Sequence, residues 1–212
     1  MSLVVKDLEF RYINGGKKIL DGFSAEFSAK GITAITGPNG TGKTTLSKLI
    51  MGILKPDKGE ILLDGVNLKS WSLAERGRKI GYVMQNPAKQ IFSQTVEEEM
   101  RFGLQNLGLS ESEIRQRTSE YLSFFQLEEH LGAFPFTLSH GEKQRLVLAA
   151  ILAMKPQYLL LDEPTASLDR KNKKRLGEYL KKTDCGIVII SHDKMFLSEY
   201  SEHVIEMERC YE

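Results

Sequence analysis

The sequence predicts an α/β fold with a mostly parallel sheet, an antiparallel β piece at its N-terminal side and a helical subdomain. Short apolar runs at 158–161 and 187–190 alternate with helical patterns, which indicates parallel strands covered on both faces. The first strands show alternating apolar positions instead. We therefore expect one domain over residues 1–212, with a core from 1–84 and 156–212 and a helical subdomain at 85–155.

The N-terminal part of the chain is predicted to be rich in strands. Segments 4–10 and 23–27 alternate apolar and polar residues, and Asn14-Gly15-Gly16 between them is a turn signal. Further strands are expected at 32–36, 60–63 and 80–84, and a helix at 43–51. A glycine-rich loop separates the strand at 32–36 from that helix.

The middle of the chain carries signals for helix starts. A Ser or Thr followed three residues later by Glu forms a capping box, because each side chain bonds the other residue's backbone N–H. These pairs are Thr95 with Glu98, Ser110 with Glu113, and Ser139 with Glu142. Pro156 ends the third helix near residue 154. Next come a strand at 158–161, a helix at 171–182 and a strand at 187–190. We expect Ser191 to open a last helix, before a strand at 204–207.

Composition excludes several classes of protein. The 29 basic and 28 acidic residues give a net charge of +1, without the basic excess typical of nucleic-acid binders. Cys185 and Cys210 lack the spacing of metal ligands, which favours a reduced cytosolic protein. No signal peptide is expected at the start, and every apolar run is far shorter than the roughly 20 residues of a membrane span.

Residues 37–44 read Gly-Pro-Asn-Gly-Thr-Gly-Lys-Thr, the P-loop pattern. Its glycines let consecutive backbone N–H groups surround a phosphate, and the helix that follows points its positive end at the same anion. The position between an apolar strand and a helix supports this interpretation, and the fold class becomes a P-loop NTPase core. The predicted ATP-binding residues of this segment are Asn39, Gly40, Thr41, Gly42, Lys43, Thr44 and Thr45.

Two acidic residues, Asp162 and Glu163, end the buried strand at 158–161. Ligands of open α/β sheets lie beyond the carboxyl ends of the strands. We expect Asp162 to hold Mg²⁺ through its water shell and Glu163 to deprotonate the attacking water. The alternative is a strand that ends in two solvated acids, and the P-loop in the same chain favours the functional interpretation.

Further segments resemble the motifs of ATP-binding-cassette ATPases. Residues 138–145, Leu-Ser-His-Gly-Glu-Lys-Gln-Arg, resemble the signature sequence, and residues 166–169 resemble the D-loop. His192 resembles the switch histidine, Gln85 the Q-loop glutamine, and Tyr12 the aromatic residue that stacks on adenine. The motifs stand in the family's order over nearly the whole chain.

The resemblance implies a head-to-tail dimer that encloses two ATP molecules. Each ATP would lie on one subunit's P-loop and under Ser139, Gly141 and Glu142 of the other subunit, either an identical chain or a paralogue. Ser139 also opens a helix, whose positive end suits an anion. His140 stands where relatives usually have Gly, and His is among the residues that tolerate a positive φ.

The resemblance also assigns roles at the site. The implied catalytic residues are Glu163, His192, Lys43 and Gln85, and the implied Mg²⁺ ligands are Thr44, Gln85 and Asp162. His192 would donate a hydrogen bond to the γ-phosphate. A plain structural histidine after a strand is the alternative for this residue.

Three classes of function compete. A small-molecule kinase would share the P-loop but gives no account of residues 138–144. A soluble ATPase of the same superfamily, acting on nucleic acid or ribosomes, usually needs paired cassettes, a long insertion or a basic surface. We therefore expect the ATPase subunit of a transporter with a separate transmembrane coupling protein. Such a subunit would be cytoplasmic and peripheral on the inner face of the cell membrane, with no nucleic-acid partner.

The segment after Gln85 resembles the same region of energy-coupling-factor ATPases, which power uptake of vitamins and of cobalt or nickel ions. The matching residues are 86–87, 90–92 and 95–98. Pro87 is expected to forbid a helix here. Ile91 and Phe92 are predicted to form an exposed docking site for a cytoplasmic helix of the membrane protein. In the alternative, they pack the helical subdomain onto the core.

Overall fold

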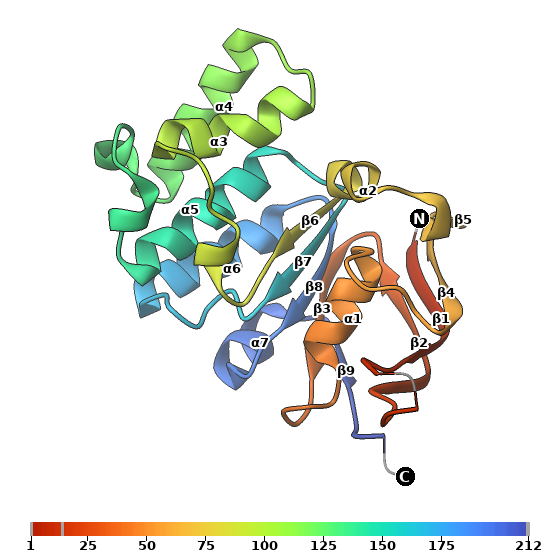
Figure 1. Cartoon of the computed structure of the whole chain (residues 1–212). Coiled ribbons are helices and arrows are strands. Elements are labelled where there is room, and N and C mark those ends of the chain that lie inside the picture. The colour runs from red at the N-terminus through yellow and green to blue at the C-terminus, as the bar shows by residue number, and fades with distance from the viewer. Residues whose placement is uncertain (1, 14, 211–212) are drawn as a thin grey trace.

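The computed structural model describes residues 2–13 and 15–210, so Asn14 of the predicted turn lies outside the described residues. Figure 1 shows a central parallel sheet between a helical group and a second, antiparallel sheet. The strands are β1 (Ser2–Phe10), β2 (Leu20–Ser28), β3 (Gly31–Thr36), β4 (Lys58–Leu63), β5 (Val66–Asn67), β6 (Ile80–Val83), β7 (Tyr158–Asp162), β8 (Gly186–Ile190) and β9 (His203–Glu206). The helices are α1 (Lys43–Ile50), α2 (Leu73–Lys79), α3 (Val96–Asn106), α4 (Glu111–Phe124), α5 (His140–Ala153), α6 (Arg170–Lys182) and α7 (Lys194–Tyr200).

The larger sheet has five strands in the order β6-β7-β8-β3-β9, and every neighbouring pair is parallel. Its register aligns Ile32 with Ile187 and Leu160 with Val188. Because all strands run the same way, the residues after β3, β6, β7 and β8 meet at one edge. The predicted α/β class is confirmed, and the P-loop, Gln85, the Asp162–Glu163 pair and His192 lie at this edge.

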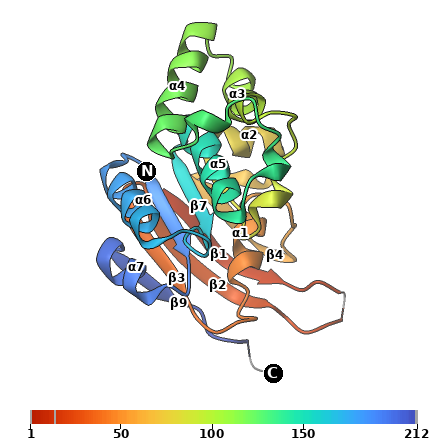
Figure 2. The ribbon, with the colours of Figure 1, turned by 90° about the vertical axis from the view of Figure 1, so that its left-hand side faces the viewer.

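The smaller sheet is antiparallel, with the strand order β2-β1-β4-β5. In Figure 2, the α3–α5 group lies at the top and the β1–β2 pair extends at the lower right. The sequence predicted this antiparallel piece at the N-terminal side, but not β5. Since β5 has only two residues, it lacks a recognisable alternation.

Side chains of the parallel strands alternate between two hydrophobic cores. Leu159, Leu161 and Ile187 face the core shared with α3–α7, whereas Leu160 and Val188 face the core shared with α1 and the antiparallel sheet. The sheet is buried on both faces, which explains the continuous apolar runs in its sequence. The core on the helical side continues from the sheet into α3, α4 and α5.

The three predicted capping boxes are confirmed at the starts of α3, α4 and α5. A fourth box, Ser72 with Glu75, opens α2, a helix that the sequence analysis did not predict. The predicted helix start at Ser191 is wrong. Asp193 is the N-cap of α7 and accepts the Phe196 N–H, so Ser191 is free to contact another element. No helix among residues 2–13 and 15–210 is long and apolar enough to cross a membrane.

Candidate functional site

The loop between β3 and α1 has a backbone that only glycine accommodates well. Gly37 and Gly42 have φ of 133° and 93°, in the region that L side chains rarely adopt. A Cβ on Gly42 would lie 2.9 Å from the Leu20 Cδ2 atom. The loop therefore follows the path that its glycines allow, and α1 begins directly at Lys43.

Lys43 lies inside this loop. Its Nζ donates to the Gly37 and Pro38 carbonyl oxygens at 2.8 Å each, and the residue is 7% exposed. Burial lowers the pKa of Lys43, while the charges of Glu163 and Asp162 act in the opposite direction. A phosphate would give this ammonium group a negatively charged partner in place of the two neutral carbonyls.

Thr44 and Asp162 meet although 118 residues separate them: the Thr44 hydroxyl donates to Asp162 Oδ2 at 2.7 Å. Asp162 is 2% exposed, and burial raises its pKa, against a smaller lowering by the Thr44 hydrogen bond. A hydroxyl and a carboxylate are oxygen ligands that suit Mg²⁺. Within the described residues, no group of three or more His, Cys, Asp and Glu side chains could hold a metal. Two oxygen donors leave the other coordination positions of such an ion to nucleotide and water.

Glu163 follows β7 in an unusual backbone conformation. Its φ is 51°, and its N–H donates to the Ile190 carbonyl at 2.8 Å. The side chain lies beside the residues after β8. Ser191 Oγ donates to Glu163 Oε2 at 3.1 Å, and His192 Nε2 lies 3.7 Å from Glu163 Oε1. A carboxylate and an imidazole therefore face each other where the phosphates are expected.

One pocket of about 180 Å³ brings most of the predicted site residues together. The predicted residues that line it are Asn39, Gly40, Gly42, Lys43, Thr44, Thr45, Gln85, Asp162, Glu163 and His192. Thr41 is not among the lining residues. It is 1% exposed, and its hydroxyl donates to the Pro38 carbonyl at 3.1 Å, so its buried side chain stabilises the backbone of the loop.

Tyr12 follows β1 and lies beside α1, outside the pocket lining. Its hydroxyl forms a 3.0 Å hydrogen bond with Thr45 Oγ1, and its ring packs edge-on against Phe10 with centroids 5.0 Å apart. The residue remains 56% exposed. This position next to the P-loop helix leaves a face of the ring available for stacking.

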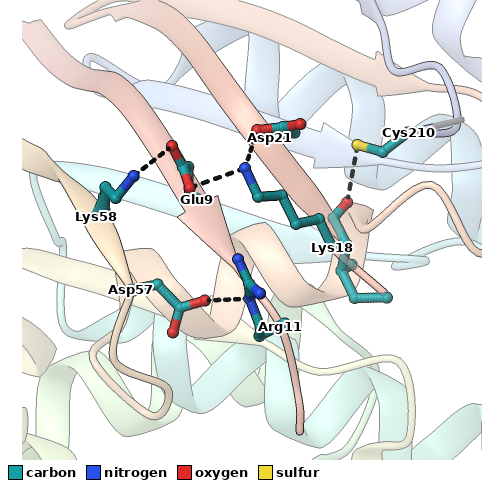
Figure 3. A network of polar contacts seen from close by, with 8 residues as sticks. Glu9, Arg11, Lys18, Asp21, Asp57, Lys58 and Cys210 are labelled. Carbon is teal, nitrogen blue, oxygen red and sulfur yellow. Dashed lines mark hydrogen bonds and ion pairs between the residues drawn. The ribbon is translucent and has the colours of Figure 1, made fainter. Parts of the chain in front are cut away.

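A polar network around Glu9 and Arg11, which precede Tyr12 in the sequence, ties β1 to its neighbours (Figure 3). Glu9 lies 3.0 Å from Lys18 and 3.3 Å from Lys58, and Arg11 lies 3.2 Å from Asp57. These pairs join β1 to the residues next to β2 and at the start of β4. The network therefore fixes the segment from which Tyr12 projects.

The signature residues lie at the start of α5 and do not line this pocket. Ser139 Oγ donates to Glu142 Oε2 at 2.6 Å, and Glu142 N–H donates back to Ser139 Oγ at 3.3 Å. A Cβ on Gly141 would lie 3.0 Å from the Ser167 carbonyl oxygen, which belongs to the D-loop of the same chain. His140 is in the first turn of α5 and is not among the described residues with positive φ, so it causes no backbone strain.

The segment after Gln85 corrects two expectations. A short 3₁₀ turn covers Pro87–Lys89, because proline in a first turn lacks only an N–H that needs no partner there. Ile91 is 4% exposed and belongs to the core, whereas Phe92 is 57% exposed. Phe92 packs edge-on against Phe102 of α3, with centroids 4.6 Å apart. The expectation of an exposed pair is wrong for Ile91 and correct for Phe92.

The contacts of two residues, Ser191 and Gln90, were not predicted from the sequence. Ser191 contacts Glu163, and Gln90 donates to the Tyr82 carbonyl at 2.8 Å and accepts the Met84 N–H at 2.7 Å. Gln90 thus pairs with the free edge of β6 as a neighbouring strand would. The position of Ser191 directly before His192 was the available signal for its contact with Glu163.

Comparisons with known proteins agree with this geometry. The profile of the family described as "ABC transporter" matches residues 20–166. The chain is 45% identical over 204 residues to a Pyrococcus furiosus protein provisionally named as an ABC transporter ATP-binding protein, covering 95% of this chain and 78% of that protein. An energy-coupling factor transporter ATP-binding protein of Mycoplasmopsis synoviae is 37% identical, over 89% of this chain and 73% of that one. The structure of cbiO1 from Clostridium perfringens, described as part of the ABC transporter complex cbiONQ, has a TM-score of 0.83 and 36% identity, over 97% of this chain and 84% of that one.

Proposed function

The chain belongs to the ABC transporter family as an ATP-binding, ATP-hydrolysing subunit, and we propose that it powers uptake through a membrane protein of the energy-coupling-factor type. Support for the uptake class comes from the energy-coupling factor relative and from the likeness to cbiO1. The segment 86–98, which resembles that class, leads to the exposed Phe92.

The pocket supports ATP hydrolysis by the following division of roles. The P-loop backbone and Lys43 bind the phosphates, and Glu163 removes the proton of the attacking water. His192 and Gln85 line the same pocket, and we assign them to the γ-phosphate of the bound ATP. The observation that carries this proposal is the convergence of Lys43, Asp162 and Glu163 on one pocket.

The donor set described above would hold Mg²⁺ through Thr44, Asp162 and Gln85. The ion would supply positive charge against the phosphates, with the remaining ligands from nucleotide and water. The 2.7 Å Thr44–Asp162 hydrogen bond keeps both oxygens together before the ion binds. Tyr12 is proposed to stack on the adenine.

Dimerisation supplies the second half of each site. ABC ATPases work as dimers with transmembrane partners, and Ser139, Gly141 and Glu142 do not reach the pocket of their own chain. We assign these residues to the nucleotide on the other subunit, where the N-terminus of α5 faces the γ-phosphate. Whether the second subunit is identical or a paralogue is decided by purification.

The test of the catalytic assignment is Glu163→Gln. We expect turnover to fall about 10²–10⁴-fold, the range for loss of a general base, while ATP still binds. ATP binding and hydrolysis are measured separately, by equilibrium titration and by phosphate release. A Gln variant that releases phosphate at the wild-type rate would remove Glu163 from this role.

The proposed docking surface is the aromatic pair Phe92 and Phe102, which are 57% and 47% exposed. A short amphipathic helix of the membrane protein would cover these two rings. Glu99, 7% exposed, accepts the backbone N–H groups of Phe92 and Ser93 at 3.1 and 2.9 Å. These bonds hold the loop in place without using either ring.

Docking is tested with Phe92→Asp combined with Phe102→Asp, and Ile91 stays intact because it belongs to the core. The variant should lose co-purification with the membrane protein from solubilised membranes and lose uptake, while its basal ATPase activity persists. A matched control replaces Val66 and Leu73, 52% and 58% exposed on other elements, with Asp and should keep the partner. Retained partner and uptake in the Phe variant would refute the docking surface, and co-purification with ribosomes would favour the soluble alternative.

A further inference from the structure

The direction of the Glu163 side chain is set by the residues that follow β8. Its left-handed φ of 51° turns the chain at the end of β7, and its N–H bonds the Ile190 carbonyl at 2.8 Å. The side chain is 14% exposed and lies against Ser191 and His192. The backbone alone leaves the carboxylate free to rotate, so its final orientation depends on these side-chain contacts.

The two carboxylate oxygens of Glu163 have different surroundings. Oε2 accepts the Ser191 hydroxyl at 3.1 Å and the His192 backbone N–H at 3.4 Å. For Oε1, the contact that the described residues provide is His192 Nε2 at 3.7 Å, which is beyond hydrogen-bond distance. One oxygen is therefore held by the protein, and the other remains available within the pocket.

We propose that Ser191 is a positioning residue for ATP hydrolysis: its hydroxyl fixes Oε2 so that Oε1 of Glu163 faces the attacking water. This inference rests on the proposed role of Glu163 as the base. Ser191 is 1% exposed, so its hydroxyl does not exchange this bond freely with solvent. Loss of the contact lets the carboxylate rotate, and misplacement of a catalytic group by about 1 Å can cost up to 10²-fold in rate.

Ser191 also has a structural contact that the test must separate from this role. Its Oγ accepts the Asp193 N–H at 3.1 Å, next to the start of α7. Removal of the hydroxyl could therefore shift His192 rather than Glu163. A purely structural role predicts a rate loss that does not depend on whether residue 163 carries a carboxylate.

The first experiment compares Ser191→Ala with Ser201→Ala in the full chain, with Mg-ATP as substrate. Ser201 is the matched control, because its hydroxyl donates to the Leu197 carbonyl at 2.6 Å at the other end of α7. We expect kcat to fall about tenfold in Ser191→Ala with KM for ATP within about twofold, and both constants to persist in Ser201→Ala. An unchanged kcat in Ser191→Ala, with a thermal midpoint equal to that of wild type, overturns the proposal.

The second experiment repeats Ser191→Ala in the Glu163→Gln background and measures single-turnover rates. We expect less than about twofold further loss, because the residue positioned by Ser191 no longer acts as a base. The same tenfold loss in both backgrounds overturns the proposal and assigns Ser191 to the structure around His192. If Glu163→Gln keeps the wild-type hydrolysis rate, the base assignment and this inference fail together. If Glu163→Gln slows hydrolysis but Ser191→Ala does not, the inference alone is refuted.

Discussion

Replacement of Asp162 by Asn should make the folded chain more stable while it weakens Mg²⁺ binding. Asp162 is 2% exposed, and burial raises its pKa because the charged form is poorly solvated there. Asn keeps an oxygen that accepts the Thr44 hydroxyl, whose bond to Asp162 is 2.7 Å. Single stabilising substitutions commonly gain about 0.5–2 kcal/mol, and we expect a gain of this order here. At this chain length, each kcal/mol raises Tm by about 2–4 °C.

This gain depends on pH, because the folded chain holds the Asp162 proton at higher pH than the unfolded chain does. Between the ordinary pKa of 3.8 and the raised folded pKa, wild type loses stability as the pH rises. The Asp162→Asn variant has no such loss. The extra stability of the variant over wild type should therefore be absent below about pH 4 and complete above the folded pKa of Asp162.

Thermal unfolding of both proteins between pH 4 and pH 8 measures this difference, without nucleotide. Asp184→Asn is the control, because the side chain of Asp184 is 79% exposed and its removal should shift Tm little. An Asp162→Asn variant that melts at or below the wild-type temperature at pH 8 would refute the reasoning. An advantage of equal size at pH 4 would also refute it.

The same pair of proteins tests the metal site. With ATP and Mg²⁺ at about 100 times Kd, wild type should gain about 2.7 kcal/mol of stability, and EDTA should remove the part that depends on the ion. In Asp162→Asn, the Tm with ATP should be the same with Mg²⁺ and with EDTA. A full Mg²⁺-dependent gain in the variant would exclude Asp162 as a ligand of the ion.

Three other substitutions address the rest of the site. Tyr12→Ala should weaken ATP binding at least about tenfold in equilibrium titration, since base stacking contributes about 1–3 kcal/mol. Tyr12→Phe should lose only the hydrogen bond to Thr45. Equal ATP affinities of wild type and both variants would remove Tyr12 from the site. A mixture of Lys43→Ala and Ser139→Arg chains should recover ATPase activity that each lacks alone, and absence of recovery, for a confirmed dimer, contradicts a site shared between subunits. Gly42→Ala should cost about 1–3 kcal/mol in denaturant unfolding because its φ is 93°, and an unchanged midpoint would show that the loop relaxes freely.

Local chemistry made some features predictable from the sequence alone. The capping boxes at Thr95, Ser110 and Ser139 were predicted correctly, because each needs only residues three positions apart. The P-loop between a strand and a helix was equally local. The start of α7 could not be predicted in this way, because Ser191 and Asp193 are both favourable N-cap residues and the local sequence does not distinguish between them. The contact of Ser191 with Glu163 leaves Asp193 to cap the helix.

The family motifs named candidate site residues, but the sequence does not show how neighbouring residues are packed. Ile91 and Phe92 are adjacent apolar residues in the sequence, and only packing against α3 and the core places Ile91 inside and leaves Phe92 exposed. Gln90 could not be predicted to pair with β6, because that bond requires β6 to be an edge strand.

The sequence by itself determined the local elements, the phosphate-binding loop and the family, because these depend on neighbouring residues or on motifs in a fixed order. The tertiary structure decided the strand order β6-β7-β8-β3-β9, which carries Thr44 to Asp162 across 118 residues and sets Glu163 beside the end of β8. It also left Ser139 outside the pocket of its own chain. These long-range contacts depend on how two hydrophobic cores pack on the two faces of one sheet, and no short segment of sequence contains that information.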